Sequence, residues 1–361
     1  MKEILLYVRR KLSVRVSLWV VLFATLIFVV ALGFLFYQAR DEVRQEAVSR
    51  ATQILDKTSL RTEGILNRVE VASNMTKWLV ERHPDEADSM FVYSRGMLQN
   101  NPDFYSCSIA FEPFYFKDKG RYFSAYTKYV GDSIRTIQGG SDDYQYFHKD
   151  WYLMPNQQGK PCWTEPYFDL DVATNTSEMV TSYCQTINDK QGKMIGVINT
   201  SLSITWLSKT ISSVRPYPNS YSIMIGRGGT YFVHPDTTKI TRQTIFTQAM
   251  DAANDNHAEG DTALIALGHA MQRGEEGVKQ MDIDGKHCYV FYKPLGQTGC
   301  SMAIVCPESD IFGGFNRLRH TVMAIVIVGL LLMLFLLIRI VTRELKPLHR
   351  LAKEAETIAS G

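Results

Sequence analysis

The stretch Val16-Ser-Leu-Trp-Val-Val-Leu-Phe-Ala-Thr-Leu-Ile-Phe-Val-Val-Ala-Leu-Gly-Phe-Leu-Phe-Tyr37 carries no charge, and most of its residues are Val, Leu, Phe, Ile or Ala. A helix needs about 20 apolar residues to cross a bilayer, because each residue rises about 1.5 Å through a hydrocarbon core about 30 Å thick. A cleaved signal peptide fits poorly, since the run is too long and ends without a small-x-small cleavage site. We therefore expect an uncleaved membrane helix over residues 16–37.

A second uncharged run, Thr321–Ile338, continues past Arg339 and predicts a second span over residues 321–341. Basic residues predict the orientation of both spans. They cluster before the first span at Lys2, Arg9, Arg10, Lys11 and Arg15, and around the end of the second at Arg339, Arg343, Lys346, Arg350 and Lys353. We expect residues 1–15 and 342–361 to be cytoplasmic, which leaves residues from about 40 to 319 outside the inner membrane.

The remaining composition is ordinary, with 45% hydrophobic and 21% charged residues, and the net charge of +2 argues against a nucleic-acid partner. All six cysteines fall in the external segment, where an oxidising space permits pairing. If Lys286–Lys293 and Gly299–Cys306 form a hairpin, Cys288 falls nearly opposite Cys306, and a disulfide can form there. Six buried free thiols are the alternative. No CxxC pair or accompanying His pair indicates a metal site.

A long charged segment without proline follows the first span. Its apolar residues recur at helical spacing, which predicts a helix over residues 38–83 that ends before Pro84. The apolar positions are Val43, Ala47, Ala51, Ile54, Leu55, Ile65, Leu66, Val69, Ala72 and Leu79. Such a helix must pack its apolar face on the following domain or on the same helix of a second chain.

From residue 84 the pattern changes to short runs rich in β-branched and aromatic residues with turn signals between them. Two units follow, residues 84–214 and residues 215–310. In the first, strands are predicted at Tyr105–Phe116, Tyr122–Val130, Ser133–Gln138, Ser177–Ile187 and Met194–Ser203. In the second, they are predicted at Ser220–Ile225, Tyr231–His234, Val278–Ile283, Lys286–Lys293 and Cys300–Cys306. The predicted fold class is α+β, with a long N-terminal helix and two modules that each contain an antiparallel sheet.

This order of elements resembles the double Cache sensor of bacterial transmembrane receptors, in which two PAS-like modules stand between two membrane helices. The hairpin Ser222–Pro235, with its Gly-Arg-Gly-Gly turn and His-Pro end, is similar to the membrane-proximal module. The elements Asp150-Trp-Tyr152, Trp163–Asp169 and Gly192–Val197 are similar to the membrane-distal module. Arg343–Gly361, with its Leu-Lys-Pro-Leu entry, resembles the opening of a HAMP linker.

The resemblance implies that the distal module binds a small ligand between its sheet and the helix and loops above it. In amino-acid-binding members, an Arg two residues before a Trp-Tyr pair holds the ligand carboxylate. Acidic residues of those members hold the ligand's ammonium group. Here Lys149 fills the Arg position, and Ser201 fills the last of the acidic positions. Both departures weaken the match to an amino acid, because Lys lacks the bidentate grip of Arg and one acid is lost for the ammonium. The expected ligand-binding residues are Lys149, Trp151, Tyr152, Trp163, Tyr167, Asp169, Tyr183 and Ser201.

The ligand classes left open are an amino acid, an amine, a carboxylate, an aromatic metabolite and a sugar. The alternative is that these rings simply fill a core. No nucleophile motif such as GxSxG is present, so we expect no catalytic residue, cofactor or metal in these residues. The expected function is the sensor of a homodimeric receptor whose cytoplasmic effector, a PP2C-type phosphatase or histidine kinase by resemblance, lies beyond this sequence. A membrane-anchored external enzyme and a protein-interaction module are the rival hypotheses.

Overall fold

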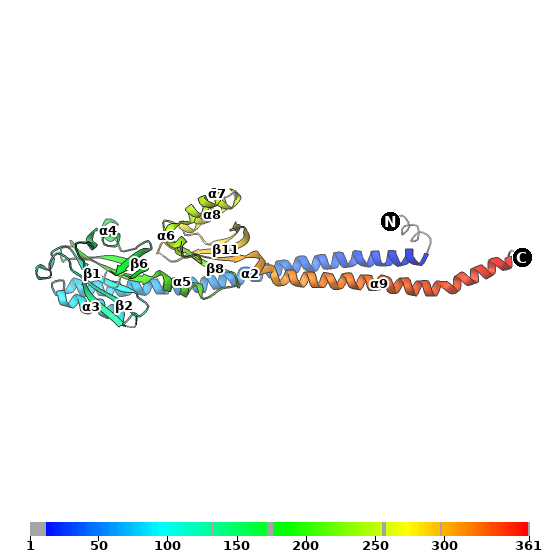
Figure 1. Ribbon diagram of the computed structural model, residues 1–361, viewed down its shortest axis with the longest axis horizontal. Coiled ribbons are helices and arrows are strands. Elements are labelled where there is room, and N and C mark those ends of the chain that lie inside the picture. The colour runs from blue at the N-terminus through cyan, green and yellow to red at the C-terminus, as the bar shows by residue number, and fades with distance from the viewer. Residues whose placement is uncertain (1–11, 132, 172–175, 255–257, 297, 360–361) are drawn as a thin grey trace. The chain divides into compact units, whose positions relative to one another are not determined.

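The computed structural model describes every residue except 1–11, 132, 172–175, 255–257, 297 and 360–361. Two helices in it are long and apolar enough to cross a membrane (Figure 1): α2 (Leu12–Arg82) and α9 (Glu308–Ala359). The chain divides into two units, one made of residues 1–49 and 309–361 and the other of residues 50–308. Helix α2 ends at Arg82, ahead of Pro84, as the sequence predicts.

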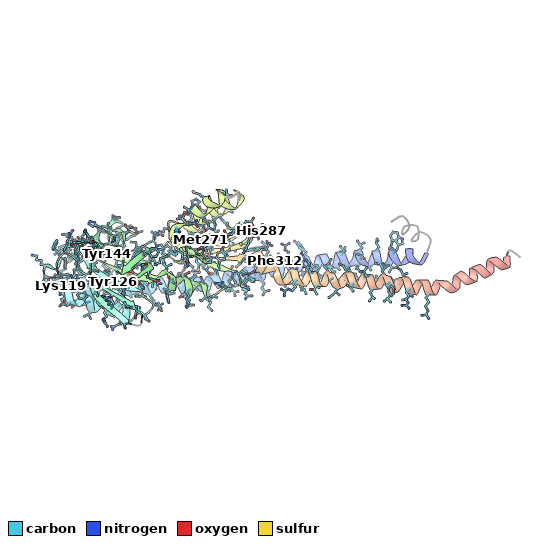
Figure 2. The ribbon with its side chains drawn as sticks, viewed as in Figure 1. Lys119, Tyr126, Tyr144, Met271, His287 and Phe312 are labelled. Atoms are coloured by element: carbon cyan, nitrogen blue, oxygen red, sulfur yellow. The ribbon has the colours of Figure 1, made fainter. Side chains whose placement is uncertain are left out.

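Within the first unit, aromatic side chains join the two helices. The rings of Phe36 and Phe315 meet edge to face with centroids 6.2 Å apart. The guanidinium of Arg40 lies 5.3 Å from the ring centroid of Phe312, which Figure 2 labels. The apolar segments beyond these contacts expose their side chains, as helices facing lipid would.

The first antiparallel sheet has seven strands among the described residues, and we call this sheet with the helices packed on it the first module. The strand order is β3-β2-β1-β7-β6-β4, and β5 also pairs with β6. The strands are β1 (Ser106–Phe111), β2 (Ser124–Val130), β3 (Ser133–Gly139), β4 (Cys162–Trp163), β5 (Tyr167–Asp171), β6 (Thr176–Asn188) and β7 (Met194–Ser203). The helices after α2 are α3 (Ala87–Gln99), η1 (Lys117–Lys119), η2 (Tyr146–His148), α4 (Asp150–Gln157) and α5 (Ile204–Ser212).

The two faces of this sheet are covered by different helices (Figure 1). Thr200 and Thr127 share a face, and there Ser73 of α2 donates to Thr200 (2.8 Å) while Ser94 of α3 hydrogen bonds Thr127 (2.8 Å). On the other face, Trp151 of α4 packs with residues of β1, β6 and β7 in a buried cluster. Since successive strand residues point to opposite faces, each strand serves both layers.

The second antiparallel sheet has five strands among the described residues, in the order β10-β11-β12-β8-β9, and we call this sheet with its helices the second module. The strands are β8 (Tyr221–Ile225), β9 (Tyr231–Val233), β10 (Gly277–Ile283), β11 (Lys286–Pro294) and β12 (Ser301–Pro307). The helices are α6 (Lys239–Arg242), α7 (Ile245–Asn254) and α8 (Ala258–Gln272). The predicted α+β fold with two antiparallel sheets is confirmed.

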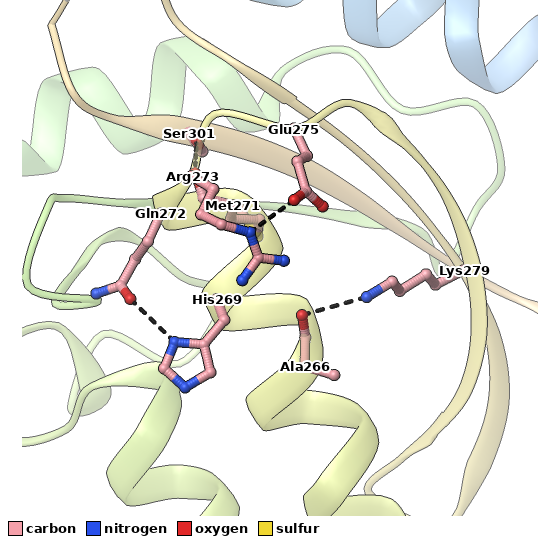
Figure 3. A network of polar contacts seen from close by, with 8 residues as sticks. All are labelled: Ala266, His269, Met271, Gln272, Arg273, Glu275, Lys279 and Ser301. Carbon is pink, nitrogen blue, oxygen red and sulfur yellow. Dashed lines mark hydrogen bonds and ion pairs between the residues drawn. The ribbon is translucent and has the colours of Figure 1, made fainter.

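Polar contacts fasten the end of α8 to the second sheet (Figure 3). The hydroxyl of Ser301 in β12 donates to the carbonyl of Met271 (2.6 Å), and Lys279 of β10 donates to the carbonyl of Ala266 (3.2 Å). Arg273 and Glu275 form an ion pair (2.6 Å) just after the helix. The bond from Ser301 satisfies one of the last four carbonyls of α8, which have no partner within the helix.

The strand register corrects the disulfide that the sequence suggests. Cys306 stands opposite Tyr289, and Cys288 stands opposite Pro307. The N–H of Leu295 donates to the carbonyl of Cys300 (2.9 Å), which fixes this register from the closed end of the hairpin. A shift of one residue puts the two thiols on opposite faces of the sheet, so the predicted pairing of Cys288 with Cys306 is wrong.

We predict that Gly196→Ala destabilises the first module by about 1–3 kcal/mol, because an added methyl group collides with the carbonyl oxygen of Ala110 on the neighbouring strand. Gly96→Ala in α3 is the control, since its methyl group meets open space and alanine favours a helix by about 0.5–1 kcal/mol. Thermal unfolding of the full chain in detergent measures both. Equal melting temperatures for the two variants would contradict this packing.

Candidate ligand-binding site

The face of the first-module sheet beneath α4 carries hydroxyl and amide side chains where a packing face would carry aliphatic ones. Register brings Ser106, Ser201 and Ser182 into one row across β1, β7 and β6, and Ser108 with Asn199 into the next. Ser124 of β2 pairs with Ala110 on the same face. All six are buried. Because buried serine is uncommon in a core, we interpret this face as a hydrogen-bonding floor, made of Ser106, Ser108, Ser124, Ser182, Asn199 and Ser201.

Hydrogen bonds tie the floor together and hold β5 onto it. The hydroxyl groups of Ser182 and Ser201 form a hydrogen bond (2.8 Å), and Ser201 donates to the amide oxygen of Asn199 (3.0 Å). Tyr167 of β5 bonds Ser182 (2.8 Å) and accepts from Asn199 (3.3 Å). Ser108 and Ser124 pair at 2.6 Å. The floor is therefore ordered before any ligand arrives, which reduces the entropy that binding must overcome.

A cavity of about 310 Å³ lies over this floor, and we call it the ligand cavity. Rings of Tyr144, Tyr146 and Trp151 line it together with Tyr126 of β2, and Figure 2 labels Tyr126 and Tyr144. Gly140 also lines it, with a φ of 102°; a side chain there would lie 2.7 Å from Cβ of Tyr122. Only glycine suits both that conformation and that close approach.

Asp169 is the one charged side chain among the described residues that line the ligand cavity. The hydroxyl of Tyr126 donates to its Oδ2 (2.7 Å). Burial, and then the charge of Asp169, raise the pKa of Tyr126 far above its usual value, so Tyr126 remains a donor at neutral pH. An ordered carboxylate among hydroxyls and rings can hold the cationic group of a small ligand.

The structure brings four of the eight predicted site residues into this cavity: Trp151, Tyr167, Asp169 and Ser201. Lys149 is exposed and does not line the cavity; its Nζ lies 5.3 Å from the ring centroid of Tyr144, which does. Tyr152 is buried in the neighbouring aromatic cluster, and its hydroxyl donates to Glu112 (2.9 Å).

Trp163 and Tyr183 line a different and larger cavity of about 830 Å³, which we call the junction cavity. Their ring centroids are 5.5 Å apart, and the indole N–H of Trp163 donates to Glu70 of α2 (2.9 Å). Tyr183 stands between Ser182 and Cys184 in β6, so its side chain points to the α2 face while theirs point to the ligand-cavity face.

Residues of both modules line the junction cavity, and Glu165 of the first module contacts the second module there. The Thr230 hydroxyl and the backbone N–H of Gly228, in the β8–β9 turn of the second module, hydrogen bond its carboxylate. A Cβ at Gly226 would lie 3.1 Å from both oxygens of Glu165, so the turn fits closely around it. The segment 163–169 thus reaches the junction cavity at Trp163 and the ligand cavity at Asp169.

Tyr126, Tyr144, Asn199 and the serines of β1 and β2 also line the ligand cavity, and they were not predicted from the sequence. One signal was available. Ser106 and Ser108 alternate within a predicted strand, and an alternating polar set marks one face that is not packed as an apolar core. Tyr144 and Gly140 come from a loop, whose position over the sheet no strand pattern predicts.

Residues 93–209 match the family model for the first PDC sensor domain of methyl-accepting chemotaxis protein-like proteins. Among curated proteins, the methyl-accepting chemotaxis protein PscA of Pseudomonas syringae pv. tomato is 23% identical over 226 residues. That alignment covers 61% of this chain and 32% of PscA, so the chain spans about a third of that relative's length.

Solved sensor domains share the fold. The extracellular domain of a protein described as the histidine kinase soHK1S-Z6 matches with a TM-score of 0.62 at 18% identity, over 76% of this chain and 99% of that one. The periplasmic sensory domain of the Campylobacter jejuni chemoreceptor Tlp1 gives 0.58 at 14%, over 75% and 98%. The ligand-binding domain of Pseudomonas fluorescens CtaA, in complex with L-isoleucine, gives 0.51 at 15%, over 77% and 99%. The predicted resemblance to double Cache sensor domains is confirmed at the level of the fold.

We predict that Tyr146→Phe costs about 1–3 kcal/mol of unfolding free energy, because the buried Tyr146 hydroxyl donates to the carbonyl of Phe111 (2.7 Å) and accepts from the N–H of Phe123 (3.0 Å). Tyr122→Phe is the control; its hydroxyl bonds the exposed Asp142 (2.7 Å), and we expect a change below about 0.5 kcal/mol. Denaturant unfolding followed by fluorescence measures both. A Tyr146 variant as stable as the Tyr122 variant would show that this hydroxyl does not anchor the cavity wall.

Proposed function

We propose that this chain is the sensing part of a transmembrane receptor, and that the ligand cavity of its first module binds a small molecule outside the inner membrane. The observation that carries the proposal is the buried hydroxyl floor with Asp169 at its edge. A face used only for packing has no reason to bury six hydroxyl or amide side chains under aromatic rings. The likeness to chemoreceptor sensor domains supports the same function.

The proposed ligand carries an amine, because Asp169 supplies a fixed negative charge and the rings supply apolar walls. A cavity of about 310 Å³ suits a metabolite of amino-acid size. The related domains of CtaA and of Mlp24 have structures with L-isoleucine and with asparagine. Because no arginine is among the described residues that line the cavity, a ligand carboxylate would bond to floor hydroxyls or draw in Lys149, so amines rank equally with amino acids.

The proposed topology has spans at residues 16–37 and 321–341 and both ends in the cytoplasm, which the basic residues beside the two runs support. Helix α9 runs unbroken from Glu308 to Ala359, so movement of the second module can pass along it to residues 342–361, the proposed start of a HAMP linker. The effector beyond is a proposal by analogy alone. A PP2C-type phosphatase, a histidine kinase and a chemotaxis signalling domain all fit such a linker.

We also propose a homodimer formed along α2. Leu60, Val71, Met75 and Trp78 expose 67%, 53%, 59% and 51% of their surfaces, and their spacing places the last three on one face of the helix. Such a stripe outside the apolar run of the membrane span is costly in water. The matching stripe of a second copy would cover it by parallel helix packing.

The rival functions have less support. A protein-interaction module would present an exposed aromatic patch, whereas Tyr146 and Trp151 are buried around a concave cavity. An external enzyme would need a nucleophile and base at a site, and the related domains are sensors of receptors. Neither rival explains the hydroxyl floor as simply as a small-molecule site does.

We predict that a thermal-shift screen of the full chain against amino acids and primary amines finds compounds that raise the melting temperature, since a ligand that binds only the folded state stabilises it. For a confirmed hit, Asp169→Asn should weaken binding about 10- to 100-fold, the value of a hydrogen bond to a charged group. Asp143→Asn is the control, an exposed acid of the preceding loop that does not line the cavity. No hit, or equal losses in the two variants, would refute the proposed site.

We predict that Met75→Glu weakens the dimer, because repeated charges would face each other across parallel helices. Val92→Glu on α3 is the control, since Val92 is also exposed (67%, against 59% for Met75) but lies off the stripe. Mass photometry of the chain in nanodiscs counts the copies. A dimer unaffected by Met75→Glu would place the interface elsewhere.

A further inference from the structure

Two cysteines stand directly opposite each other at the edge of the first-module sheet, and they are not the pair that the sequence suggests. In the β4–β6 ladder, Cys162 pairs with Cys184 and Trp163 pairs with Tyr183. Residues opposite in an antiparallel ladder have Cα atoms about 4.5–5.5 Å apart and side chains on one face. That spacing lies within the roughly 4.4–6.8 Å that a disulfide spans.

The two thiols differ in access. Cys162 is half-buried and lines the junction cavity, whereas Cys184 is completely buried beside Tyr146 and Trp151. Burial raises the pKa of the Cys162 thiol, while the charges of Arg227 and Lys160 partly offset that rise. Burial raises the pKa of Cys184 much further. A reagent in the junction cavity therefore meets Cys162 first and reaches Cys184 only through it.

We propose that Cys162 and Cys184 are a thiol–disulfide exchange site, with Cys162 as the entry thiol and Cys184 as the resolving thiol. Its substrate is a disulfide, either a small molecule or the disulfide of a partner thiol oxidase, and the junction cavity is the entrance. Strand β4 has two residues and lies at the sheet edge. It can therefore move to bring the sulfur atoms of Cys162 and Cys184 within bonding distance without disturbing the inner strands.

The exchange balances in two steps. Cys162, as a thiolate, attacks one sulfur of the oxidant, and the oxidant's S–S bond breaks to give a mixed disulfide and one released thiol. Cys184 then loses its proton and attacks Sγ of Cys162, which releases the second thiol and forms the Cys162–Cys184 bond. Two electrons and two protons pass from the cysteine pair to the oxidant, which becomes two thiols.

The bond would fix the start of the segment that connects the two cavities. Trp163 follows Cys162 and donates a hydrogen bond to Glu70. Glu165 comes next and is held by the second-module turn, and Asp169 follows in the ligand cavity. Oxidation therefore clamps this segment to β6 and makes its response to a ligand redox-dependent. This consequence rests on the proposed function, whereas the exchange site itself does not.

The test incubates the reduced full chain, in nanodiscs under anaerobic conditions, with glutathione disulfide. Remaining thiols are alkylated after denaturation, and peptides are mapped by mass spectrometry. We expect a Cys162–Cys184 cross-linked peptide, with Cys107, which is buried on the opposite face of the sheet, still reduced and alkylated. In Cys184→Ser, Cys162 should retain glutathione as the trapped mixed disulfide.

Cys300→Ser is the matched control, because Cys300 also lines the junction cavity but stands in the second module. It should leave the Cys162–Cys184 cross-link intact. A chain with both cysteines still alkylated, or a cross-link from Cys162 to Cys300, would overturn the proposal. Peptide mapping reads the bond whether or not any ligand binds, so its failure is distinct from failure of the proposed receptor function.

Discussion

The opposite chemistry of the two faces of one sheet is the constraint on which the rest of this structure depends. In β1, β6 and β7, every second side chain points to α2 and α3, and the alternate ones include the residues of the hydroxyl floor. The α2 face supplies stability, with apolar residues such as Ile109 and Leu202 completely buried. The other face can therefore carry the polar floor at the ligand cavity, while the buried cluster around Trp151 packs on the same face beside it.

The use of both sheet faces also explains how a ligand in the ligand cavity can affect α2 and the second module. Helix α2 packs on the sheet face behind the floor, and the segment 163–169 joins the ligand cavity to the turn of the second module through Glu165. A ligand changes an equilibrium only by binding one arrangement better than another. A ligand held by Asp169 can favour one arrangement of the two modules, because Asp169 and Glu165 lie in the same short segment.

The sequence predicted the architecture well, and four of the eight residues that it proposed for the site line the ligand cavity. Long periodic signals sufficed for the two apolar helices and for the end of α2 before Pro84. The face of the sheet to which each strand side chain points did not follow from the sequence. Tyr183 neighbours the floor residue Ser182 yet faces α2, and Cys288 missed Cys306 by one position. A one-residue error in register inverts every face assignment, and only the partner strands fix the register.

The central claim is that the ligand cavity holds an amine against Asp169. A crystal structure of residues 50–308 in complex with the tightest-binding compound tests it most directly, provided that fragment binds as the full chain does. The account predicts the ligand over the hydroxyl floor, with its nitrogen within hydrogen-bonding distance of Asp169 and its body between Tyr144 and Trp151. A ligand seated instead in the junction cavity beside Trp163, with the floor empty, would contradict it.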